Sequence, residues 1–456
     1  MNTTSFSRKL LRTVALTGGC LVLVALLFVA VLFFEGEDPA VTLDGAVDSI
    51  GRNGSLSFAI SDSKSGLRNI SIVAVQGAKS HEIYAASFPR AALTGHVGPA
   101  EVKETLTFDT RKLGLEEGPM VLRLAVSDYS LRGWLRGNTT VIERSMNVDT
   151  VPPRLNLLHS EKYISPGGAG IAIYRLSEEG CRSGVTINGR FHPGFPVGNG
   201  RNDVHIAYFA LPHDAAKVEQ ATVSAADRAG NEALQSFMPV YKGVAKKTDT
   251  IAISETFLAA KVPEFQQHYP EMKGDLLQQY LFTNTTLRDR NNRQIEQLCA
   301  NPLAERLWQG AFGRMAGSPR AGFADHRSYS YNGAIIDQQV HLGVDIASTS
   351  HAEVRAANRG KVIFAEYLGI YGNMVMIDHG QGVFSLYSHL SQIDTSPGTL
   401  VDKGTPLGLT GTSGMAGGDH LHFSMLVNGV FVMPKEWWDP HWIEVTIDGP
   451  LAQSKM

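Results

Sequence analysis

The chain has 456 residues, of which 43% are hydrophobic, and a formal net charge of −3. A length of this order predicts about two to four domains. The small net charge provides no strong basic field, which argues against a nucleic-acid binder that gains affinity by counterion release. The 46 glycines and 20 prolines are spread through the chain, as is typical of turn-rich β-structure.

An uninterrupted apolar run at residues 14–34 is the first predicted element. A helix that rises about 1.5 Å per residue crosses a hydrocarbon core of about 30 Å over this length. Lys9 and Arg12 precede the run, and Glu35 and Glu37 follow it. The positive-inside rule therefore predicts residues 1–13 as the cytoplasmic N-terminus of a single-pass protein of the cell membrane, with the bulk of the chain periplasmic or extracytoplasmic.

A cleaved signal peptide is the alternative interpretation of this run. Its apolar region would be shorter and would end in small residues. Here the run ends in Val31-Leu-Phe-Phe34, which favours an uncleaved transmembrane signal anchor at residues 14–34.

Residues 41–150 and 151–243 are predicted to form two Ig-like β-sandwich domains. β-Branched or alternating stretches such as Ile70–Val75 and Met120–Val126 are separated by turn residues at intervals typical of a sandwich. Asp149-Thr-Val-Pro-Pro153 predicts a rigid, extended boundary between the two domains. We interpret both as spacers, with contact to the cell wall or to an unidentified protein partner as the alternative.

Residues 244–310 show helical spacing of leucine, phenylalanine and tryptophan, with helices predicted at 255–261, 275–281 and 288–309. This indicates a helical connector. We favour a packed linker, and the alternative is a latency segment that lies against an active-site groove.

Residues 311–456 are predicted to form a compact, all-β domain of normal domain size. Strands are predicted at Gly360–Glu366, Asn373–Asp378 and Val383–Ser388, with glycine-containing turns between them. The expected fold class of the whole chain is therefore mainly β, with one N-terminal transmembrane helix and a helical connector.

The three cysteines, Cys20, Cys181 and Cys299, contain no Cys-x-x-Cys pair, so that a cysteine-based zinc site is not supported. Cys181 and Cys299 could pair in an oxidising compartment. Two separate thiols are the favoured interpretation.

Histidine motifs in the last third of the chain carry the strongest chemical signal. Alternate residues of a strand share a face, so His420 and His422 are predicted to point the same way. This pair alone is a weak signal, but His341 and Asp345 add further candidate ligands. Zinc accepts imidazole nitrogen and carboxylate oxygen, and a catalytic site has three protein ligands and one open position. The residues therefore predict a site of His341, Asp345 and one of the two strand histidines.

Further motifs follow in a fixed order: His341-Leu-Gly-Val-Asp-Ile-Ala, Tyr371-Gly-Asn, Tyr387-Ser-His-Leu, Gly408-Leu-Thr-Gly-Thr-Ser-Gly and His420-Leu-His-Phe. Together they resemble the lysostaphin/LytM-type zinc metallopeptidases, which cleave peptides of bacterial cell-wall peptidoglycan and have a duplicated hybrid motif fold. His351 and Asp419 depart from the family pattern. Neither removes a ligand, and both are expected to change the shape of a loop.

The resemblance implies one Zn²⁺ per catalytic domain, held by His341, Asp345 and His422. It also implies that His389 and His420 are the two catalytic histidines that do not bind the metal. Histidine titrates near neutrality, which suits proton transfer from water to a leaving amine. Which of the two is the general base stays open.

Tyr371 and Asn373 are expected to bind substrate, with a role in a turn as the alternative. The remaining histidines of this region are interpreted as structural or surface residues: His326, His351, His379 and His441.

The function that the resemblance implies is a membrane-anchored zinc metalloendopeptidase that hydrolyses stem or cross-link peptides of peptidoglycan. One alternative is a non-catalytic envelope factor that regulates cell-wall amidases, and another is a metal-dependent binding module. The complete set of site residues favours the enzyme. The scissile bond, D-alanine to a diamino acid or glycine to glycine, stays open.

Overall fold

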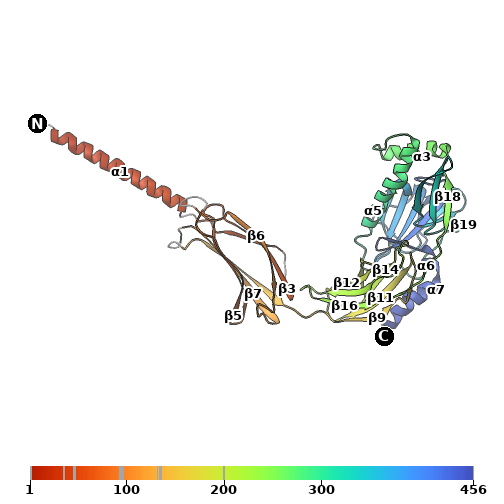
Figure 1. The fold of residues 1–456 in the computed structure, drawn as a ribbon, viewed down its shortest axis with the longest axis horizontal. Helices are drawn as coiled ribbons and strands as arrows, with labels where there is room; N and C mark the ends of the chain where they lie inside the picture. The colour runs from red at the N-terminus through yellow and green to blue at the C-terminus, as the bar shows by residue number, and fades with distance from the viewer. Residues whose placement is uncertain are drawn as a thin grey trace. The chain divides into compact units, whose positions relative to one another are not determined.

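The computed structural model describes residues 3–33, 36–44, 48–91, 97–130, 132, 136–198 and 201–454. Strands dominate, and one long helix stands at the N-terminal end, so that the predicted mainly-β class is confirmed (Figure 1). The chain divides into two compact units: Met1–Pro152 with Asp227–Asn231, and Pro153–Ala226 with Glu232–Met456. The domain limits expected from the sequence stay predictions.

Helix α1 (Thr3–Phe33) contains the predicted apolar run. Its segment Leu10–Val29 is long and apolar enough to cross a membrane, and none of it is buried against the rest of the chain. A spanning helix and a signal sequence share these properties. Phe34 and Glu35 lie outside the described residues.

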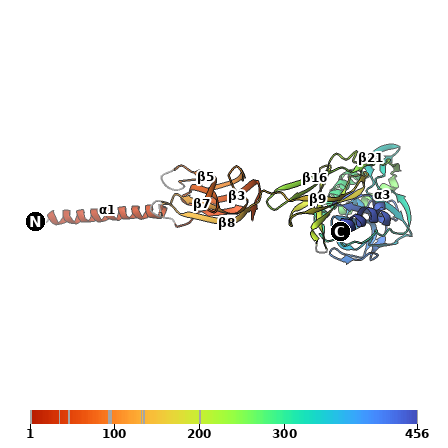
Figure 2. The ribbon, with the colours of Figure 1, turned by 90° about the horizontal axis from the view of Figure 1, so that it is seen from below.

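The described strands of the first unit form a three-stranded sheet, β1-β3-β6, and a five-stranded sheet, β2-β8-β7-β4-β5 (Figure 2). Phe58, Ile72 and Leu124 from the two sheets share one buried core, because alternate residues of each strand face inward. The strand bounds are β1 (Ala40–Asp44), β2 (Ser49–Ile50), β3 (Asn53–Ser61), β4 (Leu67–Gln76), β5 (Lys79–Ser87), β6 (Glu101–Asp109), β7 (Gly118–Asp128) and β8 (Thr139–Val148).

The second unit begins with a seven-stranded sheet of order β16-β15-β12-β13-β14-β11-β9 and a short pair, β10 and β17. Strand β13 pairs with both β12 and β14, which joins two sheet sections into one. The strand bounds are β9 (Leu155–Ser160), β10 (Tyr163–Ile164), β11 (Ala169–Leu176), β12 (Arg182–Ile187), β13 (Arg190–Gly198), β14 (Arg201–Ala210), β15 (Ala221–Ala226), β16 (Glu232–Phe237) and β17 (Val240–Tyr241).

Both faces of β14 are buried. Ala207 and Phe209 face a core within the β9–β17 region. Ile206 and Tyr208 face the other way and pack in a core that includes Trp308 and, in the C-terminal region, Phe312. The second β region and the C-terminal region therefore share a hydrophobic core.

The predicted connector consists of β18 (Thr248–Ala252), α3 (Glu255–His268), α4 (Leu276–Phe282), a π-helical turn η1 (Thr283–Leu287) and α5 (Arg288–Leu298). The side chains of Ser254 and Asp275 cap α3 and α4, as expected for residues that satisfy the first free N–H groups of a helix. The third helix ends at Leu298, whereas the sequence predicted 309. Pro302 follows soon after, and residues preceding proline disfavour the helical conformation.

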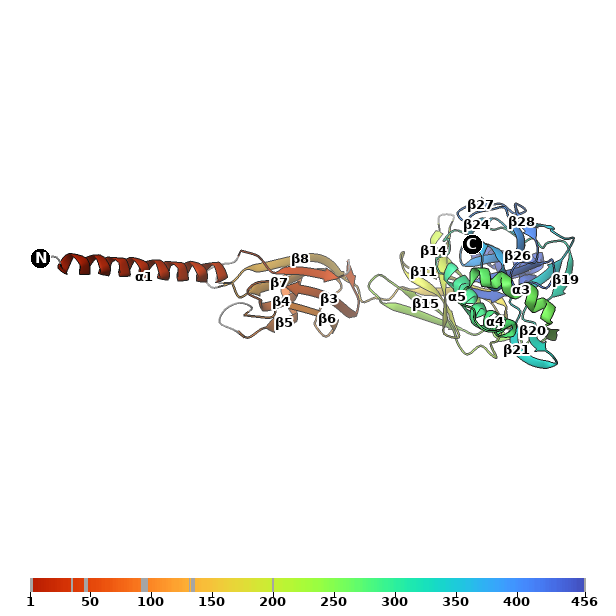
Figure 3. The same cartoon turned by 90° about the horizontal axis from the view of Figure 1, so that it is seen from above.

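The C-terminal sheet has the order β19-β22-β29-β26-β25-β24-β27, with β23, β28 and β30 paired beside it. Helices α3, α4 and α5 lie over one side of this region (Figure 3). A separate sheet, β18-β20-β21, borders it. The bounds are β19 (Ser318–Ala321), β20 (His326–Tyr331), β21 (Ala334–Val340), β22 (Val344–Ala347), β23 (Glu353–Arg355), β24 (Gly360–Tyr367), η2 (Gly369–Tyr371), β25 (Asn373–Asp378), β26 (Val383–Ile393), β27 (Leu400–Val401), β28 (Pro406–Thr410), β29 (Leu421–Val427) and β30 (Val430–Val432).

The strands predicted at 360–366, 373–378 and 383–388 are confirmed. The sequence prediction of an all-β domain did not include the helical C-terminal segment. It consists of α6 (Pro434–Trp438), α7 (Pro440–Ile443), the π-helical turn η3 (Glu444–Asp448) and α8 (Gly449–Ser454).

Candidate metal centre

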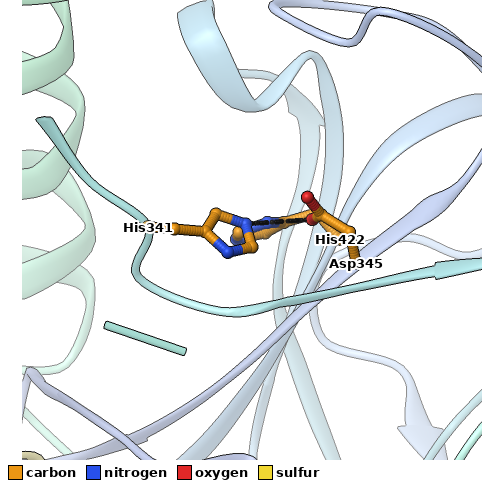
Figure 4. Close-up of side chains that lie close together, drawn as sticks. All are labelled: His341, Asp345 and His422. Carbon is orange, nitrogen blue, oxygen red and sulfur yellow. Dashed lines mark hydrogen bonds and ion pairs between the residues drawn. The ribbon is translucent and has the colours of Figure 1, made fainter. Parts of the chain in front are cut away.

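Three predicted ligands converge beside strands β22 and β29 of the C-terminal sheet (Figure 4). Asp345 on β22 and His422 on β29 are direct cross-strand partners, so the sheet register brings them together. His341 precedes β22. The Nε2 atom of His341 lies 3.0 Å from Asp345 Oδ1 and 2.9 Å from His422 Nδ1, and His422 Nδ1 lies 2.9 Å from Asp345 Oδ1.

The outer contacts of both imidazoles decide which ring nitrogens carry protons. His341 Nδ1 donates to the Gly322 carbonyl at 2.7 Å. The Ser424 hydroxyl donates to the Leu342 carbonyl at 2.8 Å, so it accepts from His422 Nε2 at 3.1 Å. In the neutral imidazoles, the facing atoms, His341 Nε2 and His422 Nδ1, carry the lone pairs. Two nitrogen lone pairs and a carboxylate oxygen meet with no hydrogen between them, and a bound cation satisfies such a donor set.

Burial and charge give the side chains the protonation states that a metal site requires. Burial lowers the pKa of His422 to about 4, so this imidazole is neutral at neutral pH. Burial alone would raise the pKa of Asp345, but its contacts with His341, His420 and His422 hold it well below its usual value. An ionised carboxylate and neutral imidazoles are the forms that bind metals.

Arg327 on β20 is a contact of the metal centre that the sequence reasoning missed. Its Nη2 atom donates to Asp345 Oδ2 at 3.1 Å, and both side chains are largely buried. The guanidinium occupies one carboxylate oxygen and leaves Oδ1 facing the two histidines. Arg327 lies before the motif set, so no motif indicates it.

A tight turn at 322–325 holds the carbonyl that orients His341. Asp325 Oδ2 accepts from Gly322 N at 2.8 Å, and the backbone of Ala324 and Asp325 exchanges two hydrogen bonds with His341. Ala324 has φ +59°, a left-handed conformation that costs free energy for residues other than glycine. Such strained positions cluster at functional sites.

Gly343 is required by the close approach of His422. A Cβ atom at this position would lie 2.6 Å from both Cε1 and Nε2 of His422 and 2.6 Å from Ser424 Oγ. Only glycine fits without displacing a ligand ring or the hydroxyl that orients it.

His389 and His420 lie beside the ligand group. Their ring centroids are 4.9 Å apart, and His420 Nε2 lies 3.5 Å from Asp345 Oδ1. Each ring is held through Nδ1, by the carbonyls of Ser413 at 2.9 Å and Gly418 at 2.7 Å. His389 has φ +63° in β26, a second strained residue at the centre.

The environments of these two histidines differ. Burial, together with the neighbouring His420 and His422, holds the pKa of His389 well below its usual value. Burial also opposes protonation of His420, but the hydrogen bond and the charge of Asp345 outweigh it and raise its pKa.

The centre opens into a hollow of about 520 Å³, which we call the metal-site hollow. The three ligands, both adjacent histidines and Tyr371 line one side of it. Residues of the connector line the other side: Ile251, Phe257, Tyr280 and Arg288.

The structure separates the two expected substrate-binding residues. Tyr371 lines the hollow with its ring, while its hydroxyl donates to Asn292 Oδ1 at 2.7 Å. Asn373 is not among the described residues that line it, and its side chain donates to the Leu390 carbonyl at 3.0 Å. Binding by either residue stays a prediction. His379 is buried and hydrogen-bonded to Arg359 O and Ser385 Oγ, as a structural histidine would be.

The sequence around this centre matches a known protein family. The model of Peptidase family M23 matches residues 339–434. Those residues form a LytM-type M23 peptidase domain.

Two curated relatives and one solved structure illustrate the similarity. Over 96 residues the chain is 40% identical to "DD-carboxypeptidase/endopeptidase Mpg" of Neisseria meningitidis, covering 21% of this chain and 22% of the relative. Over 95 residues it is 37% identical to "Murein hydrolase activator EnvC" of Escherichia coli, covering 21% and 23%. A solved M23 peptidase from Pseudomonas aeruginosa is 20% identical with a TM-score of 0.38, covering 60% of this chain and 95% of that one. The chain thus spans less than a quarter of the length of these curated relatives.

Proposed function

We propose that this protein is a membrane-anchored zinc metalloendopeptidase that hydrolyses peptide bonds of peptidoglycan. The observation that carries the proposal is the convergence of three potential ligand atoms, His341 Nε2, Asp345 Oδ1 and His422 Nδ1, within 3.0 Å of one another. Imidazole nitrogen and carboxylate oxygen are zinc ligands, and three protein ligands are the number found in catalytic zinc sites.

Zinc bound there would lower the pKa of water toward neutrality and polarise the scissile carbonyl. The chain's own residues bind and orient around it. His341 and His422 are fixed through Gly322 and Ser424, which prevents rotation of their rings. Arg327 restrains Asp345 to one metal-facing oxygen.

His389 and His420 are the proposed proton-handling residues. Both line the metal-site hollow, and the Nδ1 of each is occupied by a backbone carbonyl. Each therefore presents Nε2 for exchange with water or a leaving amine. Such positioned groups contribute typically about 10²–10⁴-fold to a rate.

Helix α1 supports the proposed location. Its exposed apolar segment Leu10–Val29 would anchor the chain in the cell membrane. With the basic residues on its N-terminal side in the cytoplasm, the peptidase domain stands on the periplasmic or extracytoplasmic side, where peptidoglycan lies. The name of the Neisseria relative, a DD-carboxypeptidase/endopeptidase, supports this substrate class.

The similarity to EnvC supports a second candidate function, a non-catalytic regulator of murein hydrolases. A regulator of this kind does not need a complete ligand set. The three converging ligands and both adjacent histidines of this chain therefore favour the peptidase.

The proposal is tested with the full-length chain in detergent, loaded with zinc, on purified peptidoglycan. Loss of cross-linked muropeptides is measured by mass spectrometry. We expect cleavage products with the zinc-loaded protein and none after removal of the metal by a chelator, with recovery on addition of zinc.

An outcome without cleavage is decisive when zinc content is measured in the same sample. Stoichiometric zinc, an intact peptidoglycan and faster hydrolysis by an added purified amidase would establish the regulator instead. Cleavage that continues without metal would refute the zinc-dependent mechanism.

A further inference from the structure

A second hollow, of about 650 Å³, adjoins the metal-site hollow. Arg320, Ala321 and Asp345 line both, so the two hollows are neighbours at a metal ligand. We call it the basic hollow. Strand β19, the edge strand of the C-terminal sheet, forms part of its wall.

Cations dominate the charged lining of the basic hollow. Lys247, Arg314, Arg320 and Lys435 all contribute to it. The described acidic residues that line it are already engaged: Asp325 accepts from Lys247 at 3.0 Å, and Asp345 belongs to the metal centre. In a chain of net charge −3, this gathering of positive charge is a local departure from the average surface.

Two of these cationic side chains, Arg320 and Lys435, differ from the others in their contacts. Within the described ranges, neither Arg320 nor Lys435 has a hydrogen-bond or ion-pair partner, and both are exposed. By contrast, Arg314 donates to the Gly317 carbonyl at 3.0 Å and lies near the ring of Trp438. Arg320 and Lys435 are thus available to an anionic ligand.

The rest of the lining suits a peptide chain. Phe323, Met433 and Trp438 supply apolar surface next to the cations. A hollow with apolar walls and a few charged groups binds by burying the ligand's carbon skeleton and orienting its charged ends. A guanidinium in this setting pairs with a carboxylate through two parallel hydrogen bonds.

We propose that the basic hollow is a substrate subsite that binds free carboxylates of the peptidoglycan peptide on one side of the scissile bond. The inference rests on the proposed function. It follows from proximity, because a peptide whose bond lies at the metal centre passes the shared residues Arg320 and Ala321, and from charge, because Arg320 and Lys435 offer positive groups that are unpaired among the described residues. An extended strand moves about 3.3 Å per residue, so a few residues suffice to reach them.

The test separates binding from hydrolysis. The probe is a cross-linked muropeptide dimer released from cell wall by a muramidase. It is compared with the same dimer after its carboxyl groups are converted to amides with ammonia and a carbodiimide. Binding to the zinc-free full-length chain in detergent is measured by calorimetry, so that no cleavage disturbs the titration.

We expect the wild-type chain to bind the carboxylate probe about fivefold to tenfold more tightly than the amide probe, since two partly exposed charge pairs contribute modestly. The Arg320→Gln, Lys435→Gln double variant should lose this preference while binding the amide probe as the wild type does. Equal affinity of the wild type for both probes would overturn the subsite.

The matched control removes the same two charge types elsewhere in the unit. Lys217→Gln with Arg359→Gln changes exposed residues that lie outside the described lining of the hollow, and it should keep the preference. If the control loses it too, general charge attraction explains the binding and the subsite is refuted. Cleavage by the zinc-loaded wild type is assayed in parallel, so a failed peptidase proposal is recognised separately from a failed subsite.

Discussion

The two walls of the metal-site hollow have different origins. The inner wall, which carries His341, Asp345, His389, His420 and His422, comes from the strands and turns of the M23 match at 339–434. The outer wall comes from β18, β20 and helices α3–α5, all of which precede that match. Most of these inner residues are buried to 8% exposure or less, whereas the outer wall combines buried residues such as Tyr280 with exposed ones such as Asp249. The inner wall has the groups for metal chemistry, and the outer wall is placed to control access and substrate contact.

The walls meet through a few polar contacts. Arg327 reaches Asp345. On α3, Lys261 donates to the Thr412 carbonyl, and Glu264 accepts from Gly414 N at 2.6 Å. Both contacts hold the loop that leads to His420. Substitutions in the inner wall should therefore abolish chemistry, and substitutions in the outer wall should tune it.

The largest effect is expected on the inner wall, where the loss of a metal ligand is compared with the loss of an adjacent histidine that does not bind the metal. His422→Ala should lose both bound zinc and peptidase activity. His420→Ala should retain zinc and lose activity by about 10²–10⁴-fold, as expected for a group that transfers protons. Zinc content by atomic absorption and muropeptide release are measured on the same preparations. Full zinc in His422→Ala would contradict the ligand assignment.

Gly343→Ala should have the next largest effect, because the added methyl group would lie 2.6 Å from the His422 ring. Overpacking of this kind costs about 1–3 kcal/mol, and here it also displaces a ligand. We expect a lower melting temperature and weaker zinc binding. Gly418→Ala is the control, because its Cβ would meet nothing within 4 Å. Equal zinc affinity in the two variants would show that the ring has room to move.

Arg327→Gln should weaken zinc binding about 10–100-fold, which is typical when a group that orients a ligand is lost. Competition with a chromophoric chelator measures this independently of activity. Arg327→Lys should recover part of the affinity, since it restores charge but not the guanidinium geometry. Arg320 also lines the metal-site hollow but makes no described side-chain contact with Asp345. Arg320→Gln should therefore leave zinc affinity unchanged. If Arg320→Gln weakens zinc binding as much as Arg327→Gln does, the effect comes from the overall positive charge around the site and not from the contact with Asp345.

The difference between the walls also explains what the sequence could predict. Strand periodicity predicts that His420 and His422 point the same way, and in the structure a ring nitrogen of each lies within 3.5 Å of Asp345 Oδ1. The chemistry of zinc ligands added His341 and Asp345, and the family resemblance then assigned His422 as the third ligand. Arg327 was beyond prediction, because its contact depends on how β20 passes the end of β22, which no local pattern specifies.

The sequence also carries a signal of how the second β region packs. Residues 204–211 on β14 and just after it alternate between two buried faces, so most of the stretch is apolar. A strand that is buried on both faces has a nearly continuous apolar sequence of this kind. The pattern therefore indicates that another part of the protein packs on the second face of the sheet. This other part is the C-terminal region together with the preceding Trp308, which shares a core with Ile206 and Tyr208. The predicted spacer role of this β region takes no account of the shared core.

The smallest effect is expected where the outer wall only steadies a loop. Glu264→Gln keeps an acceptor for Gly414 N but removes the charge that pairs with Lys261 at 3.2 Å. Because Glu264 is partly exposed, the loss is modest. We expect KM to rise about twofold to fivefold with kcat nearly unchanged, and faster amide hydrogen exchange at 411–418. Glu296→Gln breaks a pair with Arg190 that lies away from this loop, and it should change neither quantity. If kcat falls instead, α3 helps to position His420 for the chemical step, and the division between a reactive inner wall and a tuning outer wall does not hold.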